Sequence, residues 1–446
     1  MRNIIKDNKW YVTIVVAFLV FSIGYKLYKE NNTNYTNKEV VNLVLQDGGI
    51  TDGLIELVDE FNLKNKDVQI DFDICDKDYI NVAITKLVNQ RKIDIFQYFD
   101  SFLVDKEEIS NLNNLNIDYS KIDNGAAVKL NNEVVGVKYG SSVPKMIINK
   151  EILYEAGIKD FNGINTYEEL IDIAKKVKEN VPGVTPIGIS TANEEDNSMM
   201  IGMPSAMNSN IYSTFWNYKE GKYTFDETAK TLEMYRNLYE NKLINEDFNI
   251  KDSKTILEDF TDKKVAITFN QYYNKDFLME NASDMDITLQ NMPVFSESDL
   301  NKRYYYSDNK ILVIRNYDKD INIENIDNHK KAVKEVYEWL MSDDVTSKLI
   351  ESESNFASFN KSNKINKSKL EFSEFNENTN FEHEILDPTI FMAVNKYYIR
   401  DIFAKLIKGE DNINSELIKL EETINSEIEN QKESMKVNLD MYKEQE

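Results

Sequence analysis

Hydrophobic positions between residues 40 and 100 follow two alternating patterns. Short apolar stretches, each typical of a strand, occur at 40–45, 68–74 and 93–99. The stretches between them repeat apolar residues every three or four positions, as one face of a helix does. The first of these faces carries Leu54, Leu57, Val58 and Phe61. Strands that alternate with helices predict a parallel sheet and therefore an α/β fold.

Polar and aromatic residues stand where these predicted strands end. In open α/β sheets, ligands bind at the carboxyl ends of the strands, near the point where the strand order reverses. The sequence therefore predicts a ligand site that includes Gln46, Asp47, Tyr98 and Asp100. For Asp47, the alternative is that its side chain only caps the glycine turn at 48–49.

A second group of alternating elements begins near residue 141. Residues 141–158 predict a strand followed by a helix, and residues 165–180 predict a helix that begins with a capping box formed by Thr166 and Glu169. Further along, we predict a helix within 224–244, strands within 263–273 and 303–316 that return the chain to the first sheet, and long helices within 329–350 and 413–435.

The last of these helices has an apolar stripe close to a heptad pattern. The stripe consists of Ile413, Leu417, Leu420, Ile424 and Ile428. We expect it to pack onto the helix's own domain, which leaves the protein a monomer. The alternative is a coiled-coil dimer.

One long apolar run, Trp10–Tyr25, follows a basic start. A helix over this run spans about 24 Å, and extension to Tyr28 gives about 28 Å, against about 30 Å of bilayer hydrocarbon. We expect an uncleaved membrane anchor with its N-terminus in the cytoplasm, followed by a tether over 31–38. Cleavage after the small-x-small triplet at 22–24 and a buried core helix are the alternatives.

Composition narrows the classes of function. The net charge of −24 would repel a phosphate backbone, so nucleic acid is not an expected partner. Cys75 is the only cysteine, which excludes an internal disulfide. The two histidines form no HExxH motif, and the sequence has no GxSxG, P-loop or GxGxxG pattern. We therefore expect no metal, no cofactor and no enzyme activity, although a carboxylate pair for glycoside hydrolysis stays open as a minor alternative.

The order and spacing of several segments resemble a known family. These segments are LIELVDEFNLKN, IDIFQYFD, NNEVVGVKYGSSVPKMIINKEILYEAGI and NTYEELIDIAKKVK, followed by KKVAITF and then KILVIRN. Together they resemble the extracellular solute-binding proteins of ABC importers, in the family 1 branch that binds sugars and oligosaccharides, over about residues 40–430. The chain departs from that pattern at Tyr25, where a lipidated cysteine is expected, at Tyr167 in place of a tryptophan, and in the turn at 270–273.

The resemblance implies a two-lobed, periplasmic-binding-protein-like fold of the Venus-flytrap type, preceded by the N-terminal apolar helix. The implied division is an anchor and tether at 1–38, a first lobe of 39–145 with 268–315, and a second lobe of 146–267 with 316–446. Strands are expected to cross between the lobes at 139–146 and near 268–273, so that the lobes close on a ligand by hinge motion.

A sugar presents apolar C–H faces and a rim of hydroxyls, so its site needs flat rings together with carboxylates or amides. Besides the four residues named above, the resemblance implies ligand contacts from Tyr139, Ser141, Ser142, Trp216, Gln271, Tyr272, Tyr305 and Tyr306. For Trp216 the alternative is a core residue, and at most one of Tyr305 and Tyr306 should face the ligand. Lys138 is expected to be a surface charge at the hinge.

The function implied by the resemblance is capture of a sugar or oligosaccharide and its delivery to the membrane subunits of an ABC-type permease. The binding domain would lie outside the cell and be held at the membrane by the N-terminal helix. The alternative is a membrane-anchored receptor that senses a ligand without transporting it.

Overall fold

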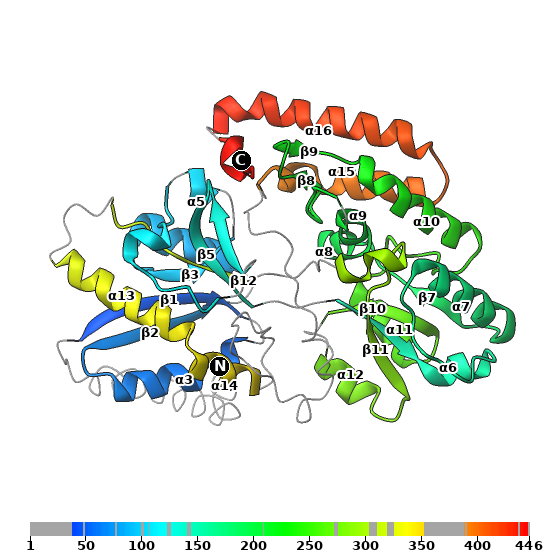
Figure 1. The fold of residues 1–446 in the computed structure, drawn as a ribbon, viewed down its shortest axis with the longest axis horizontal. Coiled ribbons are helices and arrows are strands. Elements are labelled where there is room, and N and C mark those ends of the chain that lie inside the picture. The colour runs from blue at the N-terminus through cyan, green and yellow to red at the C-terminus, as the bar shows by residue number, and fades with distance from the viewer. Residues whose placement is uncertain are drawn as a thin grey trace, which may run out of the picture.

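The computed structural model shows two lobes side by side (Figure 1). We call the lobe built on a six-stranded sheet the first lobe and the one built on a four-stranded sheet the second lobe. The structure describes residues 38–47, 50–75, 78–99, 102–105, 107–122, 126–140, 144–207, 209–271, 275–302, 310–318, 325–351, 388, 390–435 and 438–444. The predicted anchor and most of the predicted tether lie outside these residues. No helix within the described ranges is long and apolar enough to cross a membrane.

The sheet of the first lobe confirms the parallel arrangement predicted for the first three strands, because β1 pairs in parallel with β2 and with β3. Its order is β2 (Val68–Cys75), β1 (Glu39–Gln46), β3 (Ile95–Gln97), β12 (Lys310–Ile314), β5 (Glu133–Gly140) and β4 (Ala127–Leu130). The strand β12 runs antiparallel to both β3 and β5. The chain therefore returns to this sheet after a long excursion, as the pattern at 303–316 predicts.

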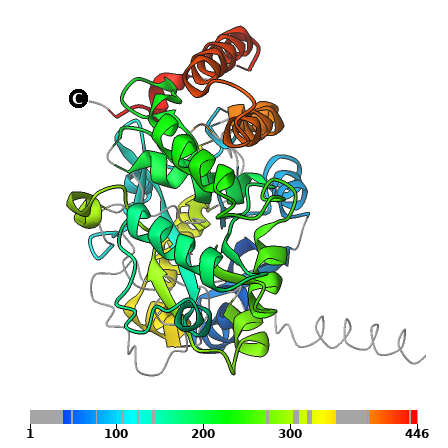
Figure 2. The ribbon, with the colours of Figure 1, turned by 90° about the vertical axis from the view of Figure 1, so that its right-hand side faces the viewer.

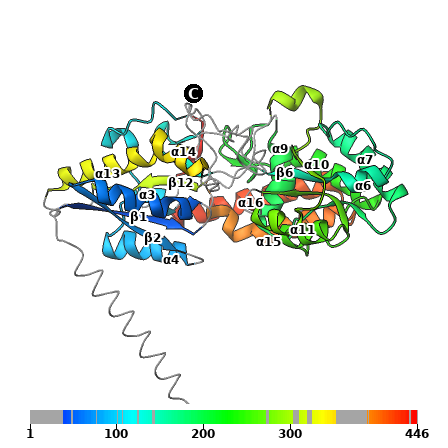
Figure 3. The ribbon, with the colours of Figure 1, turned by 90° about the horizontal axis from the view of Figure 1, so that it is seen from below.

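Helices cover both faces of this sheet. One face carries α3 (Ile50–Lys64), the short η2 (Leu112–Leu115), α13 (Ile326–Leu340) and α14 (Asp343–Glu351), and the other carries α4 (Tyr79–Ile84), the π-helical turn η1 (Thr85–Gln90) and α5 (Phe102–Asp105). Figure 3 shows α3 and α13 on one side of β1 and β2 and α4 on the other. Alternate residues of β1 enter two different apolar clusters, Leu43 on the α3 side and Val44 on the α4 side, as the period of a strand requires.

The second lobe has a smaller mixed sheet. Its order is β11 (Ile287–Asn291), β6 (Lys145–Asn149), β10 (Val265–Asn270) and β7 (Thr185–Gly188). Around it lie α6 (Lys150–Glu155), α7 (Tyr167–Asn180), α8 (Glu194–Asn197), η3 (Ser198–Gly202), α9 (Met203–Ala206), η4 (Asp226–Thr228), α10 (Ala229–Glu240), α11 (Ser253–Thr261), α12 (Lys275–Asn281) and η6 (Glu297–Lys302). The capping box predicted for α7 is present: the Thr166 hydroxyl accepts a hydrogen bond from the Glu169 backbone N–H.

The C-terminal part of the chain completes the second lobe. It contributes α15 (Ile390–Ile407), α16 (Ile413–Met435) and the final turn η9 (Leu439–Tyr442), which lie near the small hairpin of β8 (Trp216–Asn217) and β9 (Lys222–Tyr223). Figure 2 looks onto this lobe and shows α15 and α16, in orange and red, at its top. The whole predicted stripe of α16, from Ile413 to Ile428, is buried in the core of the lobe. The helix therefore packs onto its own domain, and the stripe is not free for a coiled coil.

Two parts of the predicted lobe division differ from the observed sheets. Residues 268–315 were assigned to the first lobe, but β10 and β11 both pair with β6 in the second sheet. Residues 316–446 were assigned to the second lobe, but α13 and α14 bury their apolar faces in the first lobe. For β10 and α13 the hydrophobic period predicts the element, but it does not specify which sheet the element joins. The strand β11 is not predicted, and the single helix predicted at 329–350 is divided into α13 and α14.

The chain passes from β5 to β6 between residues 140 and 145, within the predicted crossing segment 139–146. The second crossing was predicted near 268–273, and this position is wrong, because Thr268 and Asn270 pair with β6 inside the second lobe. The chain instead returns to the first lobe between the end of β11 at Asn291 and the start of β12 at Lys310.

Candidate functional site

The chain passes from β5 in the first sheet to β6 in the second, and the pairing of these strands shows which edges of the two sheets are joined. In the first lobe, Gly140 pairs with Lys310, and two residues further on Leu312 pairs with Gln97 at the end of β3. In the second lobe, Lys145 pairs with Asn270 at the end of β10. The crossing thus connects the carboxyl edge of β1 and β3 to the carboxyl edge of β7 and β10. The carboxyl edges of the two sheets, where ligands bind in open α/β folds, therefore lie at the junction between the lobes.

Side-chain amides mark the first-lobe edge. The half-buried Gln46 ends β1, and the buried Gln97 ends β3 and directs its Nε2 toward Gln46 Oε1 at 3.4 Å. The Tyr79 hydroxyl donates to the Gln97 backbone carbonyl. Burial raises the pKa of Tyr79 far above its ordinary value, so this hydroxyl stays protonated. Gln97 is not among the predicted site residues. Its position at the end of a predicted strand is the feature of the sequence from which it could have been predicted.

The other two described residues predicted for this edge are Asp47 and Tyr98. Asp47 is exposed, and its Oδ1 accepts a hydrogen bond of 3.1 Å from Thr51 Oγ1 in the first turn of α3. The glycine turn at 48–49, which Asp47 was expected to cap in the alternative interpretation, lies outside the described residues. Tyr98 is 9% exposed, and its backbone N–H donates to Ile311 O at 2.7 Å. The strand-end positions of both residues therefore agree with the prediction.

Buried polar groups gather at the second-lobe edge. Gln271 follows β10, is 1% exposed, and donates through Nε2 to Glu195 Oε1 at 2.9 Å. Its Oε1 and the Oδ1 of Asn197 are buried acceptors that have no hydrogen-bond partner among the described residues. Buried polar atoms in native proteins are nearly always paired, so an unpaired acceptor at a strand end marks a place where a ligand or a water molecule can bind.

Neighbouring contacts fix this edge in place. Asp196 accepts hydrogen bonds from Ser190 Oγ at 2.6 Å, from Asn193 Nδ2 at 2.8 Å and from the Ser253 backbone N–H at 3.0 Å. These contacts tie the start of α8 to the end of β7 and to the start of α11. Glu195 and Asn197, which flank Asp196, are therefore held rigidly. Sequence reasoning missed all three, because nothing in their local pattern indicates proximity to β10.

Six predicted site residues lie outside the described residues: Asp100, Ser141, Ser142, Tyr272, Tyr305 and Tyr306. Tyr139, a predicted site residue, and Lys138, a predicted surface charge, are both buried. Tyr139 is 1% exposed and belongs to the apolar core of the first lobe, where burial raises its pKa well above the ordinary value. Lys138 is 4% exposed and therefore is not a surface charge.

Trp216 is a core residue and not a stacking platform at the ligand edge. Its side chain is fully buried in the second lobe. The indole Nε1 donates to the Tyr442 backbone carbonyl at 3.0 Å, and the ring packs edge-on against Tyr223 with a centroid distance of 5.2 Å. The sequence left these two readings open, and burial excludes the ligand contact in this conformation.

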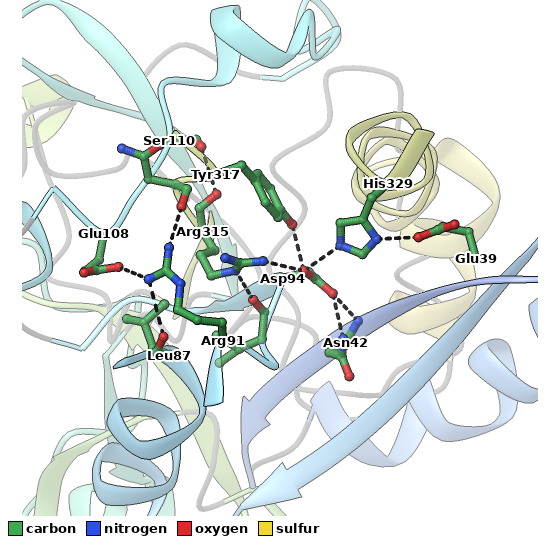
Figure 4. Close-up of polar contacts among 12 residues, drawn as sticks. Glu39, Asn42, Leu87, Arg91, Asp94, Glu108, Ser110, Arg315, Tyr317 and His329 are labelled. Atoms are coloured by element: carbon green, nitrogen blue, oxygen red, sulfur yellow. Dashed lines mark hydrogen bonds and ion pairs between the residues drawn. The ribbon is translucent and has the colours of Figure 1, made fainter. Parts of the chain in front are cut away.

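A polar network in the first lobe lies away from these edges (Figure 4). Its centre is Asp94, which is 1% exposed and precedes β3, at the amino end of the strand. Asp94 accepts from the Asn42 backbone at 2.8 Å and from the Tyr317 hydroxyl at 2.8 Å, and its Oδ1 lies 2.9 Å from His329 Nε2. The network connects α13 to the opposite edge of the sheet, so its role is structural. No cluster of three potential metal-ligating side chains occurs among the residues that the structure describes.

The chain was compared with known families, curated proteins and solved structures. No family model and no curated protein matches the sequence. Solved structures do match. A cyclic α-maltosyl-1,6-maltose-binding protein from Arthrobacter globiformis has a TM-score of 0.71 at 15% identity, covering 88% of this chain and all of that chain. The sugar-binding protein MalE from Xanthomonas citri has a TM-score of 0.69 at 12% identity, covering 90% of this chain and all of that one.

A third structure is described as a family 1 extracellular solute-binding protein, from Bifidobacterium longum subsp. infantis. Its TM-score is 0.68 at 16% identity, covering 88% of this chain and 99% of that chain. The chain therefore has the two-lobed α/β fold of these binding proteins over nearly their whole length. This confirms the two-lobed part of the predicted fold, whereas the predicted N-terminal helix lies outside the described residues.

Proposed function

We propose that this chain is an extracytoplasmic solute-binding protein that captures a sugar or oligosaccharide between its two lobes and delivers it to an ABC-type membrane permease. The observation that carries the proposal is the arrangement of the two strand edges. Each edge presents amide and carboxylate groups, and the second-lobe edge holds two buried acceptors, Gln271 Oε1 and Asn197 Oδ1, without protein partners among the described residues.

The chemistry of these groups fits a polyhydroxylated ligand. Amide and carboxylate oxygens accept hydrogen bonds from hydroxyl groups, and amide N–H groups donate to them. A ligand that contacts both edges favours the conformation in which both can reach it, which is the thermodynamic basis of lobe closure. The fold supports the same conclusion, since solved structures with this fold include a protein in complex with raffinose at 14% identity.

We further propose that the apolar run at 10–28 keeps the full-length protein on the outer face of the cell membrane. The position of the first described residues supports this arrangement. Lys38 precedes β1 and donates to Asn62 O at 2.9 Å, at the amino edge of the first sheet. A tether attached there leaves the opposite, ligand-binding edge accessible. Membrane fractionation of expressing cells, followed by intact mass of the membrane form, tests the anchor.

A thermal-shift screen of the detergent-purified full chain against mono- and oligosaccharides tests the binding function. A sugar at a hundredfold its Kd should add about 2.7 kcal/mol to the free energy of unfolding. The sugar should be recovered unchanged by mass spectrometry, because a hydrolase would convert it. If no carbohydrate in the screen raises the melting temperature, the proposed ligand class is wrong.

A pair of variants then locates the site. Gln46→Ala removes an amide from the first-lobe edge and should weaken binding of the identified sugar about tenfold, the equivalent of one hydrogen bond of about 1.4 kcal/mol. The matched control is Asn114→Ala, which removes an exposed amide from η2 near the amino edge of the same sheet. Equal affinity of the two variants by calorimetric titration contradicts the assigned edge.

A further inference from the structure

The last described residues, 438–444, form a short segment that is held firmly by the second lobe; we call it the C-terminal segment. Trp216 Nε1 donates to Tyr442 O at 3.0 Å, and the Glu444 backbone N–H donates to Tyr218 O at 2.8 Å. The Tyr442 side chain is fully buried. The Lys443 side chain lies so close to Gly221 that a Cβ at that glycine would be 2.5 Å from it.

The same segment also contacts the first lobe. The Asn131 backbone N–H, in the turn that joins β4 to β5, donates to Met441 O at 3.1 Å. Asn131 and its neighbour Asn132 have φ values of 50° and 63°, so this turn has a fixed left-handed conformation. Figure 1 shows the segment, at the end marked C, between the two lobes. This contact is separate from the three passages of the chain between the lobes, at 140–145, 291–310 and 351–390.

Apolar packing accompanies this hydrogen bond. Leu439 and Met441 are partly buried against one continuous apolar cluster. That cluster contains Leu130 at the end of β4 in the first lobe as well as Trp216 and Tyr442 in the second. The C-terminal segment therefore belongs to an apolar region that both lobes share.

The C-terminal segment is attached more strongly to the second lobe than to the first. Two hydrogen bonds and a fully buried ring attach the segment to the second lobe. One backbone hydrogen bond, from Asn131 to Met441 O, joins it to the first lobe. A net hydrogen bond of ordinary strength changes an equilibrium between two conformations by roughly 2- to 10-fold. Such a contact is strong enough to favour one lobe angle and weak enough to be released.

We propose that the C-terminal segment is a latch. Carried by the second lobe, it holds the first lobe through the contact of residues 438–444 with the β4–β5 turn, and a change of the lobe angle releases this contact. The latch biases the conformations of the protein before any ligand binds, so its test does not depend on the identity of the ligand.

Interlobe distance distributions of the full-length protein without ligand test the latch. Reporters are attached through azide side chains introduced at Lys331 on α13 and Lys176 on α7, both of which are exposed. The double variant Leu439→Ala/Met441→Ala removes apolar packing of the segment and should increase the population at other distances roughly 2- to 10-fold. The control Lys443→Ala alters the same segment at Gly221 and should leave the distribution unchanged. An unchanged distribution in the double variant overturns the proposal.

A cross-link gives a second test that does not weaken the fold. In a Cys75→Ser background, Asn131→Cys and Met441→Cys place two thiols across the contact. The oxidised and reduced forms have the same sequence, so they differ only in the link. The oxidised form should have a narrower distance distribution than the reduced form, centred on the same distance as the wild type. Equal widths in the two forms show that the segment does not set the lobe angle.

Discussion

The two tryptophans among the described residues, Trp216 and Trp339, differ in how deeply they are buried. Trp216 has its ring against Tyr223 and its N–H on a backbone carbonyl, so both its apolar and its polar groups are satisfied inside the second lobe. Trp339 on α13 is only half-buried and packs against Phe61 with a centroid distance of 4.7 Å. The difference in burial gives the two tryptophans different expected contributions to stability.

Trp216→Ala should lower the free energy of unfolding by about 3–5 kcal/mol, the usual cost of truncating a buried large aromatic residue. Ligand affinity of the folded protein should stay close to that of the wild type, because the ring does not lie at the strand edges. Urea melts and calorimetric titration measure the two quantities. The control Trp339→Ala should cost clearly less stability. Lost affinity with an unchanged urea midpoint contradicts the core role of Trp216.

At the scale of elements, α13 is attached to the first sheet by both packing and charge. Its apolar face, Ala332, Val333, Val336, Tyr337 and Leu340, is buried against the sheet. Its first turn carries His329, whose Nδ1 lies 2.8 Å from Glu39 Oε1 and whose Nε2 lies 2.9 Å from Asp94 Oδ1. The helix is thus connected to the start of β1 and to the residue before β3.

The charges around His329 shift its pKa in the opposite direction to its burial. Burial alone lowers the pKa of His329, but the hydrogen bonds and charges of Asp94 and Glu39 outweigh it and raise that pKa above 6.5. Burial alone raises the pKa of Asp94, but His329 and Asn42 outweigh it and hold that pKa below its ordinary value. Arg315 Nη2, at 3.6 Å from Asp94 Oδ1, and the Tyr317 hydroxyl complete the surroundings.

These shifts predict how stability changes with pH. Because the pKa of His329 is higher in the folded than in the unfolded protein, its charged contacts stabilise the fold fully below about pH 6.5, the unfolded value, as long as Asp94 stays ionised. This stabilisation is lost as the pH rises through the folded pKa. The stabilisation from Asp94 is present above its unfolded pKa and is lost as the pH falls through its depressed folded pKa.

His329→Gln should therefore lower the free energy of unfolding most at about pH 6, by about 1.5–3 kcal/mol, the range for a hydrogen bond to a charged group. The deficit relative to wild type should shrink at pH values above the folded pKa of His329. Urea melts of both proteins between pH 5.5 and pH 9 measure this. A deficit that stays constant over the whole range contradicts a charged His329.

At the scale of the whole molecule, the two lobes are joined by chain crossings, one of which connects the carboxyl edges of the two sheets, and by the contact of the C-terminal segment. The crossing from β5 to β6 is short, since β5 ends at Gly140 and β6 begins at Lys145. A short connection between two rigid sheets allows rotation about the connection while each lobe moves as a unit. Under the proposed function, this geometry lets the lobes close over a bound ligand.

Small-angle scattering of the full chain with a saturating amount of the identified sugar should give a smaller radius of gyration than without it, because closure brings the centres of the lobes together. The Gln46→Ala variant at the same sugar concentration should show a smaller fraction of closed protein. An unchanged radius in a sample with calorimetrically proven binding excludes hinge closure and leaves the binding proposal intact.

Local structure was determined by the sequence itself. The capping box of α7 and the buried stripe of α16 involve residues within one or a few helical turns, so their pattern is readable without knowing the rest of the fold. The parallel order of β1, β2 and β3 also follows from the alternation of strands and helices. The positions of Gln46 and Asp47 at a strand end follow from the same pattern.

Only the tertiary structure decided how distant segments combine. An amphipathic helix or an apolar strand can pack on either lobe, so nothing in the local pattern of β10 or α13 indicates its sheet. The burial of Trp216 depends on the backbone of Tyr442, and the hydrogen bond of Gln271 depends on Glu195 in another element. Each of these contacts joins residues far apart along the chain. The sequence therefore determined the elements and the edges that carry polar groups, whereas their pairing across the two lobes required packing of the complete chain.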